Sequence, residues 1–144
     1  MFEGASTLSV DAKGRISIPT RYRDALTGAS GGMLHLTRHF NEPCLLLFAE
    51  EEWGRFRERV AQWPASDAWA KRRTLGHAVQ VEMDAGSGRI LIAPDLREAA
   101  RIGKEAKLLG NGSHFELWDK ELYGIKETHA EQEPVSATLA GFVF

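Results

Sequence analysis

Two short segments of this 144-residue chain combine an acid, a glycine and a cation in nearly the same order: DAKGRISIP from residue 11 and DAGSGRILIAP from residue 84. In the first segment, Asp11 can accept hydrogen bonds from the N–H groups of a tight turn, and Gly14 can adopt a positive φ. Lys13 and Arg15 then project from a rigid tip. Cations held in this way can neutralise phosphates, and an arginine can bind guanine through two parallel hydrogen bonds.

The two segments belong to a longer internal repeat. When Gly14-Arg15 is aligned with Gly88-Arg89, the matched pairs are Ile16 with Ile90, Ile18 with Ile92, Arg23 with Arg97, and Ala25 with Ala99. Further along, CLLLFAEEEW from residue 44 aligns with HFELWDKELY from residue 114, and both have an apolar strand pattern that ends in an aromatic residue before an acidic helix start. The chain is therefore expected to contain two copies of one unit, in which Arg89 occupies the place of Arg15.

Each copy predicts a strand, a turn, a second strand, a short helix and two more strands. Alternating apolar residues indicate the strands, which are expected at 8–11, 16–18, 33–37 and 44–48 in copy one, and at 79–83, 89–92, 106–109 and 114–118 in copy two. A helix is expected from Thr20 to about Leu26, with a loop over 27–32. Between the copies, apolar residues at helical spacing predict helices over 51–63 and 67–75.

These elements predict a mainly β fold with short helices, in the α+β class. Four short strands make a poor core alone, so the two copies are expected to face each other, pair their hairpins and close a small barrel with pseudo-twofold symmetry. The expected units are copy one at 6–54, a helical connector at 55–78, copy two at 79–124 and a tail at 125–144. The tail is polar and then apolar, and we expect it to be mobile or docked on a neighbouring molecule.

Composition limits the classes of protein to consider. Hydrophobic residues make up 43% and charged residues 26% of the chain, and the formal net charge is −2. No apolar run approaches the roughly 20 residues that a membrane-spanning helix needs, and the N-terminus does not resemble a secretory signal. Cys44 is the only cysteine, so no disulfide framework is expected and a cytoplasmic location is favoured. A nucleic-acid partner would have to be bound by a few well-placed cations, multiplied by oligomerisation.

The remaining candidates for chemistry are weaker. His35 and His39 are four residues apart, but on a strand and loop rather than on a helix, and no cluster has zinc spacing. Ser87 has no evident base. We therefore expect no metal, no cofactor, no small-molecule substrate and no enzyme activity.

Aromatic and basic residues between the copies leave two interpretations open. The tryptophans Trp53, Trp63 and Trp69 could stack on bases, although their helical spacing favours the core or a subunit interface. The AKRR segment at 70–73 could contact phosphate, although a solvated helix end is favoured, since cations near a helix C-terminus are stabilising.

The segments DAKGRISIPTRYR and GRILIAPDLR, with PCLLLF, LGHA and FELWD, resemble the MraZ family over roughly residues 1–124. That resemblance implies two SpoVT-AbrB-type motifs in one chain, which form a double-ψ or swapped-hairpin AbrB-like barrel. It also implies a ring-shaped homo-oligomer that binds short direct repeats in double-stranded promoter DNA. The promoter is that of the operon that encodes the protein with cell-wall and division genes, and the expected outcome is repression, in the cytoplasm on the nucleoid and without membrane association.

By position, the resemblance implies DNA binding by Arg15, with Lys13 beside it in the turn that Gly14 forms, and by Arg89 in copy two. Copy two departs from copy one because Gly86 stands where copy one has Lys13 and because its turn is one residue longer. Its tip therefore carries fewer cations. The alternative function is an AbrB-like protein-interaction or antitoxin-type module. Two motifs in one chain argue against that alternative, while the tail from residue 127 keeps it open.

Overall fold

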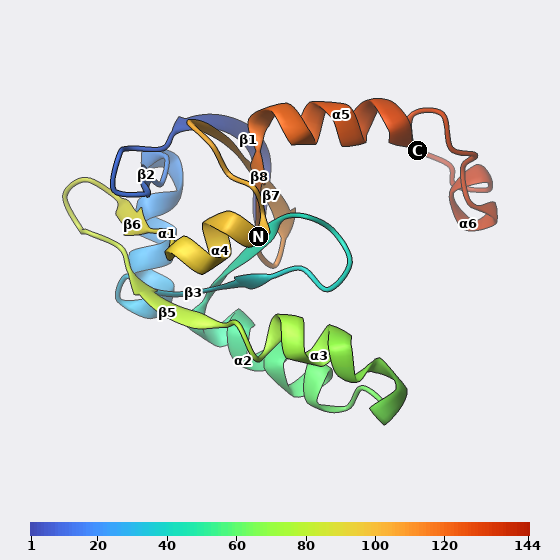
Figure 1. The fold of residues 1–144 in the computed structure, drawn as a ribbon, viewed down its shortest axis with the longest axis horizontal. Helices are drawn as coiled ribbons and strands as arrows, with labels where there is room; N and C mark the ends of the chain where they lie inside the picture. Colours follow the sequence, from blue (N-terminus) through green and yellow to red (C-terminus); the bar gives the residue numbers. More distant parts are fainter.

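A computed structural model describes residues 1–144, and its elements follow the predicted order in both copies (Figure 1). The strands are β1 (Phe2–Ser9), β2 (Arg15–Ser17), β3 (Met33–Arg38), β4 (Leu45–Ala49), β5 (Val79–Glu82), β6 (Arg89–Leu91), β7 (Glu105–Gly112) and β8 (Phe115–Asp119). The helices are α1 (Thr20–Ser30), α2 (Glu50–Ala61), the 3-10 turn η1 (Ala65–Asp67), α3 (Ala68–Thr74), α4 (Pro94–Ala99), α5 (Lys120–Ala130) and α6 (Ala137–Ala140). The α+β class is confirmed.

The sheets are built from strands of both copies. A six-stranded antiparallel sheet has the order β1-β7-β8-β4-β3-β5, and β2 pairs with β6 in a separate two-stranded ribbon. If each copy-one strand is exchanged for its copy-two equivalent, the six-stranded order is reproduced in reverse. The fold therefore has the pseudo-twofold symmetry expected from the repeat. The first strand of each copy crosses over to pair with the third strand of the other copy, which is the swapped arrangement.

The β2–β6 ribbon lies on the pseudo-twofold axis. Its central pair is Ile16 opposite Ile90, and both side chains are buried at 1% exposure. Because side chains alternate between the two faces of a strand, the residues on either side of this pair face outward. The outward-facing pairs are Arg15 opposite Leu91 and Arg89 opposite Ser17. The two repeated GR segments thus meet as neighbouring strands.

One hydrophobic core serves both copies. Its 18 buried residues include Ile18 and Leu36 from copy one and Ile92 and Leu117 from copy two. Burying one such side chain contributes about 1.5–3 kcal/mol, and neither copy could assemble this core without the other. A smaller cluster under α2 contains Leu46, Phe48 and Trp53.

The three tryptophans between the copies have different surroundings. Trp53 is a core residue, and Trp63 packs edge-on against Phe40 at 5.5 Å between ring centroids. Trp69 is 70% exposed and lies under the guanidinium of Arg72, which is 4.7 Å from its ring centroid. The core interpretation thus applies to Trp53 and not to Trp69.

Two expected boundaries are wrong. Helix α1 does not end near Leu26 but continues through Gly28 to Ser30. Gly31 ends it, with φ 60° and an N–H that donates to the Thr27 carbonyl at 2.7 Å. Most of the expected 27–32 loop is therefore helical. Strand β1 begins at Phe2, well before the predicted start, because its whole length pairs with β7.

The end of the chain lies apart from the core. Helix α5 begins as the acidic pattern predicts, with the Asp119 carboxylate accepting a hydrogen bond from the Leu122 N–H at 3.0 Å. Figure 1 shows α5 leading away from the sheets to α6 at the far right. Several apolar side chains here are exposed, namely Ile125, Val135, Leu139, Phe142, Val143 and Phe144. No helix combines the length and the apolar character that crossing a membrane requires.

Candidate nucleic-acid interface

The copy-one turn is held by a network centred on Asp11. Its Oδ1 accepts hydrogen bonds from the backbone N–H groups of Lys13 and Arg15, both at 2.9 Å, and its backbone carbonyl accepts from Gly14 N–H at 3.0 Å. Gly14 has φ 85°, which favours glycine. The turn is therefore rigid for the reasons that its sequence predicts.

The Asp11 carboxylate also holds the side chain of Arg15. Its Oδ2 lies 2.8 Å from Arg15 Nε, and the Arg15 side chain remains 36% exposed. Hydrogen bonds from the Arg15 backbone N–H, which is the largest cause, and from its guanidinium lower the pKa of Asp11 to about 2. The carboxylate is thus ionised at neutral pH, so it orients the Arg15 guanidinium at the surface. Lys13 is exposed, and its side chain has no ion-pair or hydrogen-bond partner.

The copy-two turn uses the same backbone design with different side-chain partners. Asp84 Oδ2 accepts hydrogen bonds from both the hydroxyl and the N–H of Ser87, each at 2.7 Å. These bonds, the hydroxyl first, lower the pKa of Asp84. Gly88 has φ 69° and donates to the Asp84 carbonyl at 2.8 Å. Because Ser87 occupies the carboxylate, the exposed guanidinium of Arg89 has no carboxylate within ion-pair distance.

Each turn is tied to the other copy through its glycine. The carbonyl of Gly14 accepts a hydrogen bond from Ile92 N–H at 2.9 Å, and the carbonyl of Gly88 accepts one from Ile18 N–H at 2.8 Å. These two bonds are related by the pseudo-twofold axis. They extend the β2–β6 pairing outward, so that the two turns are fixed relative to each other.

A pair of arginines braces this arrangement. Arg23 Nε donates to the Ile18 carbonyl at 2.8 Å, and Arg97 Nε donates to the Ile92 carbonyl at 3.1 Å. Each guanidinium covers the buried glycine of the opposite turn, and a Cβ at Gly14 would lie only 2.5 Å from Arg97 Cζ. The repeat in the sequence makes Arg23 and Arg97 equivalent, but it does not by itself predict this structural role. The sequence feature that indicates a shared role is their spacing, since each follows the arginine of its turn, Arg15 or Arg89, by eight residues.

The structure brings Arg15 and Arg89 onto one surface. Both border a shallow hollow of about 350 Å³ on the outer side of the ribbon, together with Thr7, Ser9 and Ser17. Figure 1 shows the two turns at the same end of the molecule, opposite α6. Arg21 does not join them, because its guanidinium is hydrogen-bonded to Ser6 Oγ at 2.6 Å.

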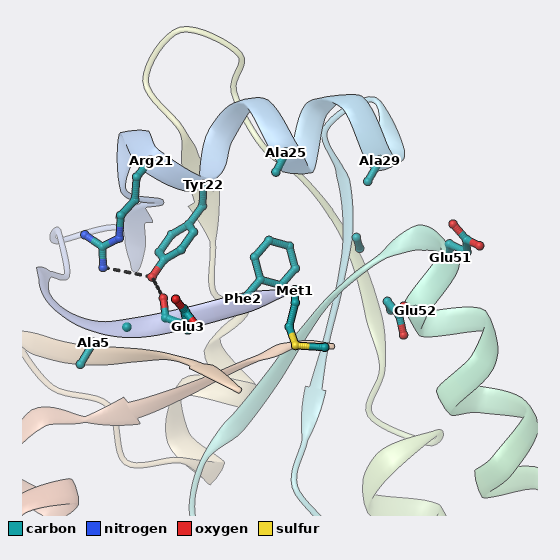
Figure 2. Close-up of a pocket in the computed structure, with 12 residues that line it drawn as sticks. Met1, Phe2, Glu3, Ala5, Arg21, Tyr22, Ala25, Ala29, Glu51 and Glu52 are labelled. Carbon is teal, nitrogen blue, oxygen red and sulfur yellow. Dashed lines mark hydrogen bonds between the residues drawn. The ribbon is translucent and has the colours of Figure 1, made fainter. Parts of the chain in front are cut away.

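A larger hollow of about 730 Å³ lies between β1, α1 and the start of α2 (Figure 2). Apolar side chains provide much of its lining, among them Phe2, Tyr22, Ala25 and Ala29. The Tyr22 hydroxyl donates to the Glu3 carbonyl at 2.5 Å and accepts from the Arg21 guanidinium at 3.0 Å, as the dashed lines in Figure 2 show. The hollow therefore offers apolar surface bordered by Arg21 and by three glutamates, Glu3, Glu51 and Glu52.

Known proteins resemble this chain over its full length. It is 56% identical over 144 residues to a protein of Acidovorax sp. (strain JS42), 52% to one of Verminephrobacter eiseniae and 50% to one of Paraburkholderia phytofirmans, with all of each chain covered. Each of these relatives is named "Transcriptional regulator MraZ". The family described as "MraZ protein, putative antitoxin-like" matches twice, over residues 1–74 and 74–141, which agrees with the internal repeat. The chain belongs to the MraZ family.

Proposed function

We propose that this chain regulates transcription by sequence-specific binding to double-stranded DNA through the outer face of the β2–β6 ribbon and its two turns. The observation that carries the proposal is the presence of Arg15 and Arg89 on one surface, held by two turns whose backbones are locked together. Its membership of a family whose relatives are named transcriptional regulators supports the regulatory part.

The geometry suits the binding of a rigid, highly charged partner. Hydrogen bonds already hold both turns, so little conformational entropy remains to be lost when they bind. A two-stranded ribbon fits the major groove of B-DNA, where an arginine that makes two hydrogen bonds to guanine contributes about 1–3 kcal/mol of discrimination. Lys13 adds a free cation for the phosphate backbone.

One such surface binds DNA weakly, so we propose that several copies act together. A ring of identical subunits joined head to tail presents the same surface in the same sense at each step, which suits direct repeats in a promoter. Linking the sites raises the effective concentration of each next contact. The proposed target is the DNA upstream of the protein's own cell-wall and division operon, and the proposed outcome is repression.

The alternative is a protein-interaction module of the antitoxin type. It is favoured by the exposed apolar residues of the tail, such as Val135, Leu139 and Phe142, and by the words "antitoxin-like" in the family description. Such a module would bind a partner protein through the tail and would have no preference for the upstream DNA.

The test compares Arg15→Ala with Arg57→Ala, which removes an exposed arginine from α2. Binding to the upstream DNA, followed by fluorescence anisotropy, should weaken about 5- to 150-fold in Arg15→Ala, since one arginine–guanine contact is worth about 1–3 kcal/mol. Binding should be nearly unchanged in Arg57→Ala. The oligomer size on gel filtration should be the same for both.

Two outcomes would contradict the proposal. Unchanged binding by Arg15→Ala removes this residue from the interface. Equal affinity of the wild-type protein for upstream and unrelated DNA of the same length contradicts sequence-specific regulation and favours the protein-interaction module.

A further inference from the structure

A second group of cations lines a pocket away from the ribbon. The pocket has a volume of about 390 Å³ and lies between the β3–β4 loop, the ends of α3 and α4, and α5. Its charged residues are Arg38, Arg73, Arg101, Lys126 and Glu42. We call this the arginine pocket. Four of its 12 lining residues are cationic, in a chain that has only 18 Lys and Arg among 144 residues and a net charge of −2.

Cations outnumber carboxylates at this pocket: four cations line it, against Glu42 in the lining and Glu116 near His39 and Cys44. Lys126 Nζ lies 3.6 Å from Glu42 Oε2, which is the only ion pair among the lining residues. Arg73 Nη1 donates to the Phe40 carbonyl at 3.0 Å, which orients the guanidinium without neutralising it. Arg38 and Arg101 have no carboxylate within ion-pair distance. Because like charges gathered in a hollow repel each other, a bound anion would stabilise the cluster.

The backbone at Arg101 is unusual. This residue has φ 57°, and it is the one non-glycine residue in the chain with a positive φ. Helix ends of this kind normally carry glycine or asparagine, since other residues pay roughly 1–2 kcal/mol there. Here the position carries a long cation that lines the pocket.

The polar groups of the β3–β4 loop indicate which hydrogen-bonding groups a ligand of this pocket would carry. Nδ1 of His39 accepts hydrogen bonds from the N–H groups of Asn41 and Glu42, both at 3.1 Å. In the neutral ring, which the burial-lowered pKa of His39 favours, Nε2 therefore carries the proton and is a donor. Oε2 of Glu42 is buried and makes no hydrogen bond, and its nearest cation, Lys126 Nζ, lies 3.6 Å away. A ligand that has a hydroxyl group beside its anionic part would supply the hydrogen bond that this ion pair is too long to make.

We propose that the arginine pocket binds a small phosphorylated molecule with a free hydroxyl, of the nucleoside di- or triphosphate class. The phosphates lie among the cations of Arg38, Arg73 and Arg101, and the ligand hydroxyl donates to Glu42. Arginine suits this role because its planar guanidinium binds two phosphate oxygens at once. The volume lies within the range of about 300–1,000 Å³ that is typical of small-molecule sites. This proposal does not depend on DNA binding by the ribbon.

The test is isothermal titration of the full chain with pyrophosphate and with ADP at 150 mM salt. We expect saturable binding of one ligand per chain, with ADP binding more tightly because it carries hydroxyl groups. The double variant Arg73→Gln/Arg101→Asn should weaken both at least tenfold. Glutamine retains a donor for the Phe40 carbonyl, and asparagine tolerates the left-handed backbone. Arg57→Gln is the matched control, since it removes an exposed arginine of α2 outside the pocket, and it should bind both ligands like the wild type.

Three outcomes would overturn the proposal. The first is that the wild type shows no saturable binding at millimolar ligand. The second is that the double variant binds both ligands as tightly as the wild type. The third is that pyrophosphate binds neither the wild type nor the double variant, while the double variant binds upstream DNA more weakly than the wild type. The third outcome would mean that these cations contact the phosphates of DNA and not a small ligand. If circular dichroism shows that the double variant is unfolded, Lys126→Gln on the exposed face of α5 replaces it, with a several-fold loss expected.

Discussion

The two turns of this protein share one backbone and differ at their tips. In both, an aspartate accepts hydrogen bonds from the turn, a buried glycine has a positive φ, and an arginine of the other copy covers that glycine. In copy one the aspartate binds Arg15, whereas in copy two it binds Ser87 and leaves Arg89 free. The shared residues therefore build the ribbon. The residues that differ set how charge is presented to a partner.

The largest expected effect is the loss of stability when the buried glycine of either turn, Gly14 or Gly88, is replaced by alanine. Gly88→Ala should lower the free energy of unfolding by about 3 kcal/mol and Gly14→Ala by about 2 kcal/mol, since each adds left-handed strain and overpacking. The difference arises because a Cβ at Gly88 would lie 2.8 Å from the rigid carbonyl oxygen of Ile18, whereas the three atoms nearest to a Cβ at Gly14 all belong to the flexible Arg97 side chain. Urea denaturation of both variants measures this, and the reverse ranking would contradict the proposed difference.

A double-mutant cycle sharpens that result. Arg23→Ala and Arg97→Ala should each cost about 1 kcal/mol, because each removes a hydrogen bond to a strand carbonyl. Arg97→Ala should also relieve much of the cost of Gly14→Ala, since the crowding side chain is gone. Arg23→Ala should not rescue Gly88→Ala, because the Ile18 carbonyl remains. If Arg23→Ala restored the stability of Gly88→Ala as fully as Arg97→Ala restored that of Gly14→Ala, the arginine side chains alone would cause the crowding at both glycines.

The difference in tip charge can be reversed by exchange. Lys13→Gly should reduce the slope of log affinity against log salt by about 1 for each subunit that contacts DNA, and Gly86→Lys should increase it by about 1 if copy two also contacts DNA. Gly86 accepts a side chain, because its φ is not in the left-handed range and its nearest neighbour, Asp84 Oδ2, would be 3.6 Å away. An unchanged slope in Gly86→Lys would restrict DNA binding to copy one.

The smallest expected effect is the loss of stability at low pH that follows protonation of Asp11. Since the folded-state pKa of Asp11 is about 2 and the unfolded value is about 3.9, its carboxylate stabilises the turn above pH 4, and this contribution is lost as pH falls toward 2. NMR titration of the Asp11 carboxyl should show this midpoint. Arg15→Ala should raise it only in part, because the backbone N–H of residue 15 is the largest cause. If the pKa of Asp11 returned to its ordinary value in Arg15→Ala, the Arg15 guanidinium would be the main cause of the shift.

Local patterns in the sequence predicted a large part of this molecule. Period-two alternation indicated the eight strands, and the paired Gly-Arg segments indicated two copies and the residues of both turns. These features depend on hydrogen bonds and steric limits within a few residues of each other, so the local sequence determines them. The length of α1 was missed because its C-terminal turn is made of small residues that also suit a loop.

Contacts between distant segments were decided only by the tertiary structure. The pairing of β1 with β7 and the bracing of Gly14 by Arg97 depend on which residues meet across the pseudo-twofold axis. The arginine pocket likewise joins residues from position 38 to position 126. No short-range pattern records such meetings, because they follow from how the shared core brings two copies of the chain together.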